Sequence, residues 1–213
     1  MDFLPEKLTE YVEAHTTPES ELLQQLNRET HLKVMMPRML SGHLQGRVLA
    51  MLSHMIKPKR VLEIGTYTGY SALCLAEGMD ESGELITIDV NEELTDMVSS
   101  YFADADMRCS IHQLVGNALE IIPNLEGPFD LVFIDADKEN YCRYFDMVIE
   151  KLSEGGYIIA DNVLWSGKVV EPVKANDADT KGIMDYNQKV HADPRVENVL
   201  FPIRDGLMLC RKC

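Results

Sequence analysis

The sequence predicts an α/β protein built on a mostly parallel sheet, because short apolar segments alternate with segments of helical periodicity from residue 60 onward. Such alternation is typical of right-handed strand–helix–strand units. The length of 213 residues suits one domain with a sizeable core and is short for two. No internal repeat or low-complexity segment is visible, so we expect one domain over residues 1–213.

Helices are expected before the sheet begins. Leu4, Leu8 and Tyr11 recur at helical spacing in the first. The second is predicted to begin at Thr17-Pro18-Glu19, which resembles an N-cap, a first-turn proline and an acid that favours the helix dipole. The apolar face of the third is expected to comprise Leu44, Val48, Leu49, Leu52 and Met55.

A methionine-rich segment lies between the second and third of these helices. Met35, Met36 and Met39 surround Pro37, which interrupts helical structure. Methionine is flexible and polarisable, so two interpretations stay open for this cluster. It either fills the core or forms an adaptable wall beside a ligand pocket.

The later elements follow in a regular order. Strands are expected at residues 60–64, 84–89, 110–114, 129–134, 156–160, 196–203 and 207–211, and helices at 70–77, 92–104, 118–122 and 141–152. A polar stretch from 165 to about 180 is expected to form a loop, followed by one more helix. Arg204-Asp205-Gly206 has the composition of a hairpin turn between the last two strands.

Composition and charge narrow the function classes. Asp and Glu total 35 against 20 Lys and Arg, and a formal charge of −15 argues against a large nucleic-acid footprint. The N-terminus lacks the pattern of a secretory signal, and no apolar run reaches membrane-spanning length. Five scattered cysteines suggest reduced thiols and a cytoplasmic protein. Cys210 and Cys213 lack the second pair that a zinc site needs.

A glycine loop follows the first strand, where an open parallel sheet binds its ligands. Gly65 and Gly69 allow backbone to approach a ligand, and the next helix offers free N–H groups. Glu63 would repel a pyrophosphate but not a cationic sulfonium. Asp89 ends the second strand and is placed to accept the hydroxyls of a ribose. The alternative is an ordinary glycine turn between a strand and a helix.

Oxygen-bearing side chains follow two further strands. Asp135 follows the fourth strand, and Asp161 and Asn162 follow the fifth. Neighbouring carboxylates need a cation or a proton between them, and oxygen donors suit Mg²⁺, with Mn²⁺ or Ca²⁺ as substitutes. The six histidines show no paired ligand spacing, which disfavours zinc. The alternative is that Asp161 and Asn162 only cap a turn.

Three motifs together resemble the cation-dependent O-methyltransferases, the caffeoyl-CoA and catechol O-methyltransferase-like enzymes, in a bacterial-type form. They are VLEIGTYTGYS at 61–71, FIDADK at 133–138 and DNVLW at 161–165, and the similarity runs over about residues 35 to 212. The resemblance implies a Rossmann-like methyltransferase fold with a seven-stranded mostly parallel sheet, helices on both faces and an antiparallel last strand. It also implies N-terminal helices at 1–55 that cover the site and contact a partner in a homodimer; the alternative is that these helices only cap the sheet.

The resemblance carries roles to individual residues. S-adenosyl-L-methionine would contact Met39, Ser41, Glu63, Gly65, Thr66, Ser71, Asp89, Ala118, Asp135 and Asp137. The metal ligands would be Asp135, Asp161 and Asn162, and the catalytic residues Lys138, as the base of catechol-type members, and Asp135. Trp165 would form an aromatic wall of the acceptor pocket with Ser166, where many plant relatives have asparagine.

The expected reaction moves a methyl group from the sulfonium to a hydroxyl of a small catechol-like or phenylpropanoid aromatic. A phenol has a pKa near 10, so coordination to a metal and proton acceptance by Lys138 would both make it a better nucleophile. The alternative for Lys138 is a surface lysine at the start of a helix.

Other functions stay open at this point. A relative of the same family could methylate a hydroxyuridine of tRNA, although the acidic charge argues against it. A nicotinamide-dependent oxidoreductase would need the tighter glycine loop that is missing here. A non-catalytic interaction protein would not need every catalytic residue type that this chain retains.

Overall fold

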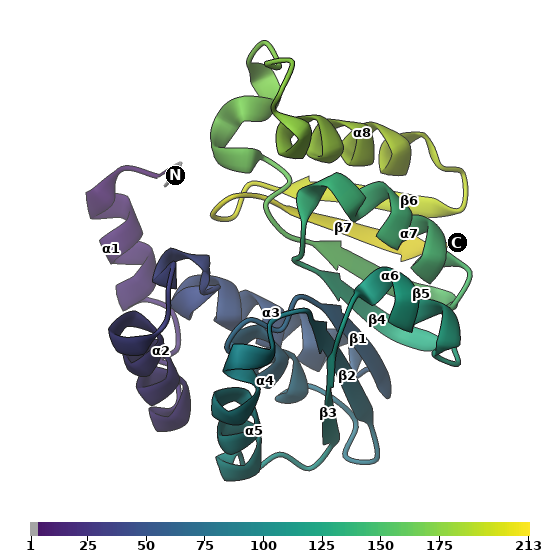
Figure 1. Cartoon of the computed structure of the whole chain (residues 1–213). Helices are drawn as coiled ribbons and strands as arrows, with labels where there is room; N and C mark the ends of the chain where they lie inside the picture. The colour runs from purple at the N-terminus through teal and green to yellow at the C-terminus, as the bar shows by residue number, and fades with distance from the viewer. Residues whose placement is uncertain (1–3) are drawn as a thin grey trace. The chain divides into compact units, whose positions relative to one another are not determined.

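The computed structural model describes residues 4–213 and contains a seven-stranded sheet in the order β3-β2-β1-β4-β5-β7-β6 (Figure 1). The strands are β1 (Arg60–Ile64), β2 (Glu84–Asp89), β3 (Ser110–Val115), β4 (Phe129–Ile134), β5 (Leu152–Ala160), β6 (Val196–Phe201) and β7 (Leu207–Lys212). Pairing is parallel for β1 with β4, β2 with β3 and β4 with β5. The last strand, β7, is antiparallel to β5 and to β6, which confirms the predicted fold class.

Helices of two kinds accompany the strands. The α-helices are α1 (Glu6–Ala14), α2 (Glu21–Lys33), α3 (Gly42–Ile56), α4 (Tyr70–Ala76), α5 (Thr95–Asp104), α6 (Ala118–Ile121), α7 (Tyr141–Ile149) and α8 (Ala178–Ala192). The 3₁₀ segments are η1 (Pro37–Met39), η2 (Glu92–Leu94), η3 (Ile122–Asn124), η4 (Lys138–Asn140) and η5 (Trp165–Val170). None of the helices described for residues 4–213 has the length and hydropathy needed to span a bilayer.

The chain divides into two compact units, and the expectation of a single domain over 1–213 stays a prediction. One unit, here the carboxylate unit, contains Val61–Ile64 and Ala118–Cys213. The other, here the glycine-loop unit, contains Leu4–Arg60 and Gly65–Asn117. Residues 1–3 of the predicted N-terminal helical region lie outside the described residues.

The carboxylate unit packs α7 and α8 against its strands. Helix α7 buries Tyr141, Tyr144, Phe145 and Val148 on one face, the spacing that places side chains on one side of a helix. Helix α8 packs on α7, on η4 and on β6, and Figure 1 shows α7 and α8 side by side. The C-terminal halves of the central strands are buried, residues 131–134 of β4 and 158–160 of β5, as expected for strands covered on both faces.

The glycine-loop unit packs α3 and α2 against α4, whose seven residues are all buried. The predicted apolar face of α3 is correct at Leu49, which is fully buried, and wrong at Met55, which is 75% exposed; the buried face also includes Gln45, Gly46 and Ser53. The reason is close helix packing: a Cβ on Gly46 would lie 2.7 Å from Cε1 of Tyr70. A small residue at position 46 therefore lets α3 approach α4 closely, and Met55 lies outside the buried face.

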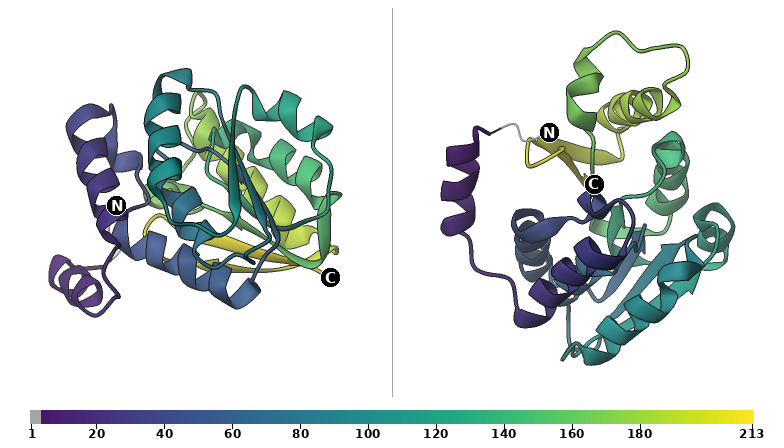
Figure 2. Two further views of the ribbon diagram at one scale, coloured as in Figure 1. Left: turned by 90° about the horizontal axis from the view of Figure 1, so that it is seen from below. Right: turned by 60° about the vertical axis from the view of Figure 1, so that its left-hand side comes forward.

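The predicted start of the second helix is also wrong. Helix α2 begins after Ser20, whose hydroxyl accepts the N–H of Leu23 at 3.3 Å. Glu19, predicted to lie in the first turn, instead accepts a hydrogen bond from the hydroxyl of Tyr70. Helix α1 precedes α2 as a separate element with no buried residue, visible at the left of the right-hand view in Figure 2.

Candidate functional site

The glycine loop after β1 has a backbone that only some residues tolerate. Gly65, Tyr67 and Gly69 have φ of 104°, 48° and 85°, in the left-handed region. Gly69 ends the loop as the N-cap of α4, and a Cβ there would lie 2.8 Å from Cε1 of Phe102. The N–H groups of Gly65 and Gly69 donate within the protein, to the carbonyls of Ile88 at 2.9 Å and Thr66 at 2.8 Å, so the predicted role as a ligand loop stays a prediction.

Asp89 holds this loop in place. Its carboxylate oxygens accept the N–H of Tyr67 at 2.7 Å and the N–H of Asn91 at 2.9 Å. A carboxylate offers about four acceptor positions, so these bonds leave capacity for two ribose hydroxyls. The hydroxyl of Thr66 pairs with that of Thr87 in the interior, so a ligand would meet Thr66 through its backbone.

The methionine-rich segment is tied to the same loop. The hydroxyl of Tyr67 donates to the carbonyl oxygens of Met35 at 3.1 Å and Met36 at 3.3 Å. Met35, Met36 and Met39 are 86%, 47% and 56% exposed, so the interpretation as core filling is wrong. Their role as a wall beside a ligand stays a prediction. Ser41, just after this segment, is buried at the start of α3.

Ser71 lies buried in the first turn of α4, immediately after the glycine loop. In the carboxylate unit, Glu63 is fully buried on β1 opposite Phe133 of β4. Ala118 is buried at the first position of α6. Their predicted contacts with the cofactor stay predictions.

The structure places Asp135 and Asp161 at the ends of paired strands. Ile134 of β4 pairs with Ala160 of β5, and each acid follows directly. The N–H of Asp161 donates to the carbonyl of Ile134 at 2.9 Å, and Asp161 is only 3% exposed. Two acids thus lie at the same edge of the sheet, as the sequence predicts.

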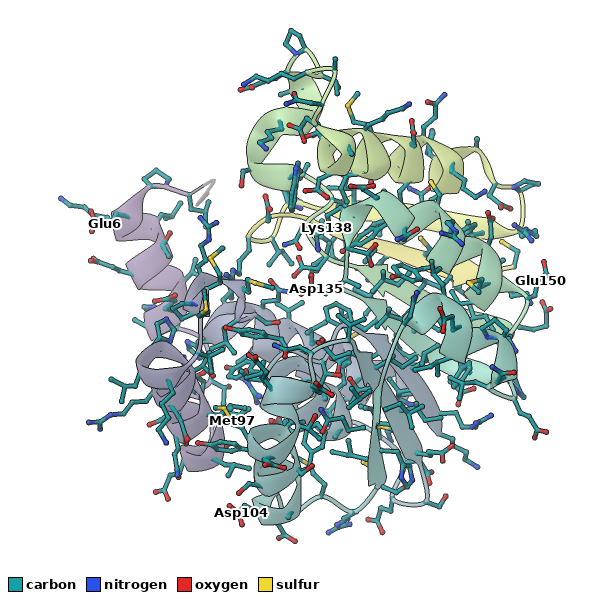
Figure 3. The ribbon with its side chains drawn as sticks, viewed as in Figure 1. Glu6, Met97, Asp104, Asp135, Lys138 and Glu150 are labelled. Atoms are coloured by element: carbon teal, nitrogen blue, oxygen red, sulfur yellow. The ribbon has the colours of Figure 1, made fainter. Side chains whose placement is uncertain are left out.

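Lys138 is buried, so its interpretation as a surface lysine is wrong. Its ammonium donates to Oδ1 of Asp135 at 2.9 Å, and Figure 3 labels both residues. It also donates to the hydroxyl of Tyr141 at 2.8 Å. The side chain is 10% exposed, which shields the ion pair from water. Burial and these two hydrogen bonds fix the nitrogen of Lys138 beside Asp135, and its predicted role as a base stays a prediction.

Tyr141 connects these groups. Its hydroxyl donates to the carbonyl of Asp161 at 3.1 Å while it accepts from Lys138. Burial, and then the charges of Asp135, Asp161 and Asp137, raise the pKa of Tyr141 well above its usual 10. The hydroxyl therefore stays protonated, and the negative charges of all three acids favour that protonated form.

Asp137 lies outside this buried group. It is exposed and accepts hydrogen bonds from the hydroxyl of Tyr144 and the amide of Asn140. The first of these bonds ties Asp137 to α7. Its predicted contact with cofactor or substrate stays a prediction.

The loop after β5 carries the remaining predicted residues. Asn162, with φ of 59°, accepts the N–H of Trp165 through its carbonyl at 3.0 Å, so it does take part in a turn. The ring centroid of Trp165 lies 5.7 Å from Nζ of Lys138 and 5.7 Å from Nζ of Lys168. Ser166 is exposed beside it. The indole is thus close to the ammonium that is the predicted base.

Sequence reasoning missed Tyr141, Tyr67 and Asp205 as parts of the site. Tyr141 stands three residues after Lys138, a helical spacing that would have signalled it. Tyr67 is in the glycine motif, but nothing in the sequence links its hydroxyl to residues 35 and 36. Asp205 was expected only as a turn residue, and it accepts the N–H of Ser166, 39 positions away.

The chain has the fold and the loop chemistry of a Rossmann-like methyltransferase. It belongs to the O-methyltransferase family, whose family model matches residues 13–213. It is 35% identical over 181 residues to caffeoyl-CoA O-methyltransferase 1 of Eucalyptus globulus, covering 79% of this chain and 72% of the relative. The caffeoyl-CoA O-methyltransferase of Petroselinum crispum is 35% identical over 182 residues, covering 79% and 74%.

Solved structures agree with this membership. The O-methyltransferase from Bacillus cereus, in complex with SAH, superposes with a TM-score of 0.88 at 28% identity over 97% of each chain. The O-methyltransferase TomG from Streptomyces achromogenes, in complex with SAM, gives 0.87 at 28% identity over 97% of this chain and 96% of TomG. The protein is an S-adenosylmethionine-dependent O-methyltransferase, so the oxidoreductase and the non-catalytic alternatives do not apply.

Proposed function

We propose that the enzyme requires a divalent cation and methylates a hydroxyl of a small catechol-like or phenylpropanoid aromatic. The observation that carries the proposal is the buried group of Lys138, Asp135 and Tyr141 next to Asp161 at the end of β4 and β5. The relatives named as caffeoyl-CoA O-methyltransferases support a phenolic acceptor.

The donor set suits a hard cation. Asp135, Asp137 and Asp161 all act on Tyr141 with negative charge, and Lys138 is the ammonium bonded within this group. Within the buried group, the two carboxylates of Asp135 and Asp161 against one ammonium leave an excess of about one negative charge, which favours a bound cation. Among residues 4–213, no three His, Cys, Asp or Glu side chains gather as ligands. Two carboxylates and the amide of Asn162 would supply oxygen donors only, and such donors suit Mg²⁺ better than zinc.

The residues would then divide the work. A cation held by Asp135, Asp161 and Asn162 would supply Lewis acidity toward a hydroxyl of the acceptor. Lys138, already placed by two hydrogen bonds, would first release its own proton to water and then, as the neutral amine, accept the proton of the phenol. Trp165 would cover one face of the aromatic ring and keep water away. On the glycine loop, Asp89 would hold the ribose of S-adenosylmethionine.

A metal titration tests the proposal. Turnover of a catechol should stop in excess chelator and return with Mg²⁺, Mn²⁺ or Ca²⁺, and activity that persists in chelator would contradict it. Asp161→Asn should abolish turnover and weaken Mn²⁺ binding in calorimetry, with SAH affinity unchanged. Asp130→Asn is the matched control, since Asp130 is on β4 and bonds Ser153 rather than this group.

Acceptor identity needs a separate assay. Labelled S-adenosylmethionine with a panel of phenols, and with purified tRNA, distinguishes a small aromatic from a hydroxyuridine acceptor. We expect label only in phenols that carry two adjacent hydroxyls, and label in tRNA alone would contradict the proposal.

The predicted homodimer also remains a proposal. The exposed apolar side chains of Leu4, Leu8 and Tyr11 support a partner for the N-terminal helix. Light scattering coupled to size exclusion would detect twice the chain mass if the proposal holds.

A further inference from the structure

The loop that follows β5 has an unusual backbone. Trp165, Ser166 and Gly167 have φ of 46°, 54° and 82°, three consecutive left-handed residues. Non-glycine residues avoid this region because Cβ crowds the neighbouring carbonyl oxygen. Such a conformation persists only where surrounding structure holds it. Some other element must therefore fix the position of Trp165.

The turn between β6 and β7 supplies that support. The carboxylate of Asp205 accepts the N–H of Ser166, and its carbonyl accepts the N–H of Leu164 at 2.8 Å. The carbonyl of Gly206 accepts the N–H of Val163 at 3.2 Å. Three N–H groups of the loop are thus bonded to two adjacent turn residues, one of them through a charged side chain.

The contact between turn and loop is close as well as hydrogen-bonded. Gly206 has φ of 89°, and a Cβ there would lie 2.6 Å from Cγ of Leu164 and 3.0 Å from its backbone nitrogen. No other residue would fit without moving the loop. Helix α8 adds one further contact, since Nδ2 of Asn187 donates to the carbonyl of Val163 at 2.8 Å. Loss of Asp205 should therefore loosen the loop without releasing it completely.

We propose that Asp205 is a positioning residue for the acceptor: through Ser166 it holds Trp165 beside the ammonium of Lys138. The consequence for the acceptor rests on the proposed function, whereas the consequence for the loop does not. Asp205 has no role in the proposed chemistry itself. Its removal should alter acceptor binding and the order of the indole, and leave cofactor binding unchanged.

Trp165 is the single tryptophan of the chain, so its fluorescence reports the loop directly. The test measures acrylamide quenching of Trp165, SAH affinity by calorimetry, and acceptor KM and kcat. We expect Asp205→Ala to raise the quenching constant about twofold and the acceptor KM about tenfold, with SAH affinity unchanged. Asp205→Asn keeps an oxygen acceptor and should lie within about threefold of wild type in KM.

Asp193→Ala is the matched control. Asp193 also accepts a backbone N–H, that of Arg195 at 3.0 Å, but it lies before β6, at the other end of the hairpin. Its loss should leave the quenching of Trp165 and the acceptor KM as they are in wild type. Equal quenching in Asp205→Ala, Asp193→Ala and wild type would overturn the proposal.

A second variant guards against misfolding. Gly206→Ala should expose Trp165 in the same way as Asp205→Ala, because the added Cβ pushes Leu164. If Asp205→Ala does not fold, the quenching of Trp165 is measured in Gly206→Ala and Asp205→Asn instead. A quenching constant in Gly206→Ala equal to that of wild type would overturn the proposal. If the wild type methylates no phenol while quenching changes as expected, the proposed function fails and the role of Asp205 in the loop stands.

Discussion

Replacement of Tyr141 by phenylalanine tests the buried hydrogen bonds around Lys138. The ring stays, so no cavity forms, and only the hydroxyl is lost. That hydroxyl accepts from the ammonium of Lys138 at 2.8 Å and donates to the carbonyl of Asp161 at 3.1 Å. A hydrogen bond that involves a charged group contributes about 1.5–3 kcal/mol, and a neutral one about 1 kcal/mol.

Relief of the desolvation of the hydroxyl offsets part of this loss. We therefore expect Tyr141→Phe to lower the free energy of unfolding by about 2 kcal/mol, from the balance of a charged and a neutral hydrogen bond. In a chain of this size that corresponds to a fall in Tm of about 4–8 °C. Without the hydroxyl, Lys138 is positioned by Asp135 alone, so kcat for a phenol should also fall.

Urea unfolding followed by Trp165 fluorescence measures the stability, and methyl transfer to a phenol measures kcat. Tyr144→Phe is the control, because Tyr144 is also on α7 but donates to the exposed Asp137, which water can solvate instead. Its cost should stay below about 1 kcal/mol. An unfolding free energy for Tyr141→Phe equal to that of wild type or of Tyr144→Phe would refute the reasoning.

Four further outcomes are expected. Lys138→Ala should lower kcat about 100-fold or more with SAH affinity unchanged in calorimetry, whereas an unaltered kcat would leave it no part in proton transfer. Asp89→Ala should weaken SAH binding about tenfold or more, because a charged acceptor is lost; equal affinity would place the ribose elsewhere. Gly182→Ala should cost about 1–3 kcal/mol in a thermal melt, since its Cβ would meet the carbonyl of Lys138. Burial raises the pKa of Tyr186 well above 10, so its contribution to stability should be complete below about pH 10 and be lost by about 1.4 kcal/mol per unit above it. Tyr186→Phe should reduce the slope of stability against pH by that amount, and an identical slope would show that other groups cause the fall.

Several strands could be predicted to the residue from sequence. Those at 60–64, 84–89 and 129–134 are observed with the same bounds, because each is a short, largely apolar run that ends at a glycine or an acid. The strand predicted at 156–160 instead begins at Leu152. Its early part pairs with Phe129 before a shift in register, which the local sequence does not show.

The ends and faces of the N-terminal helices depended on tertiary contacts. Thr17 and Ser20 are both good N-cap residues, so the local sequence allows either start for α2. Glu19 accepts a hydrogen bond from Tyr70, which is 51 positions later in the chain and lies on α4. The buried face of α3 is decided by the close approach of α4 at Gly46. Neither contact can be predicted from the helix propensity of the local sequence.

The amino-acid sequence by itself determined which chemical groups end the strands: Asp89, Asp135, Asp161 and the glycine loop. The reason is that side-chain period and strand length set where each strand stops and which residue comes next. Only the tertiary structure decided that Lys138 is buried against Asp135 and Tyr141, and that Asp205 holds the loop of Trp165. Hydrogen bonds and burial depend on distance in space, and these partners meet only once the strands and helices have packed.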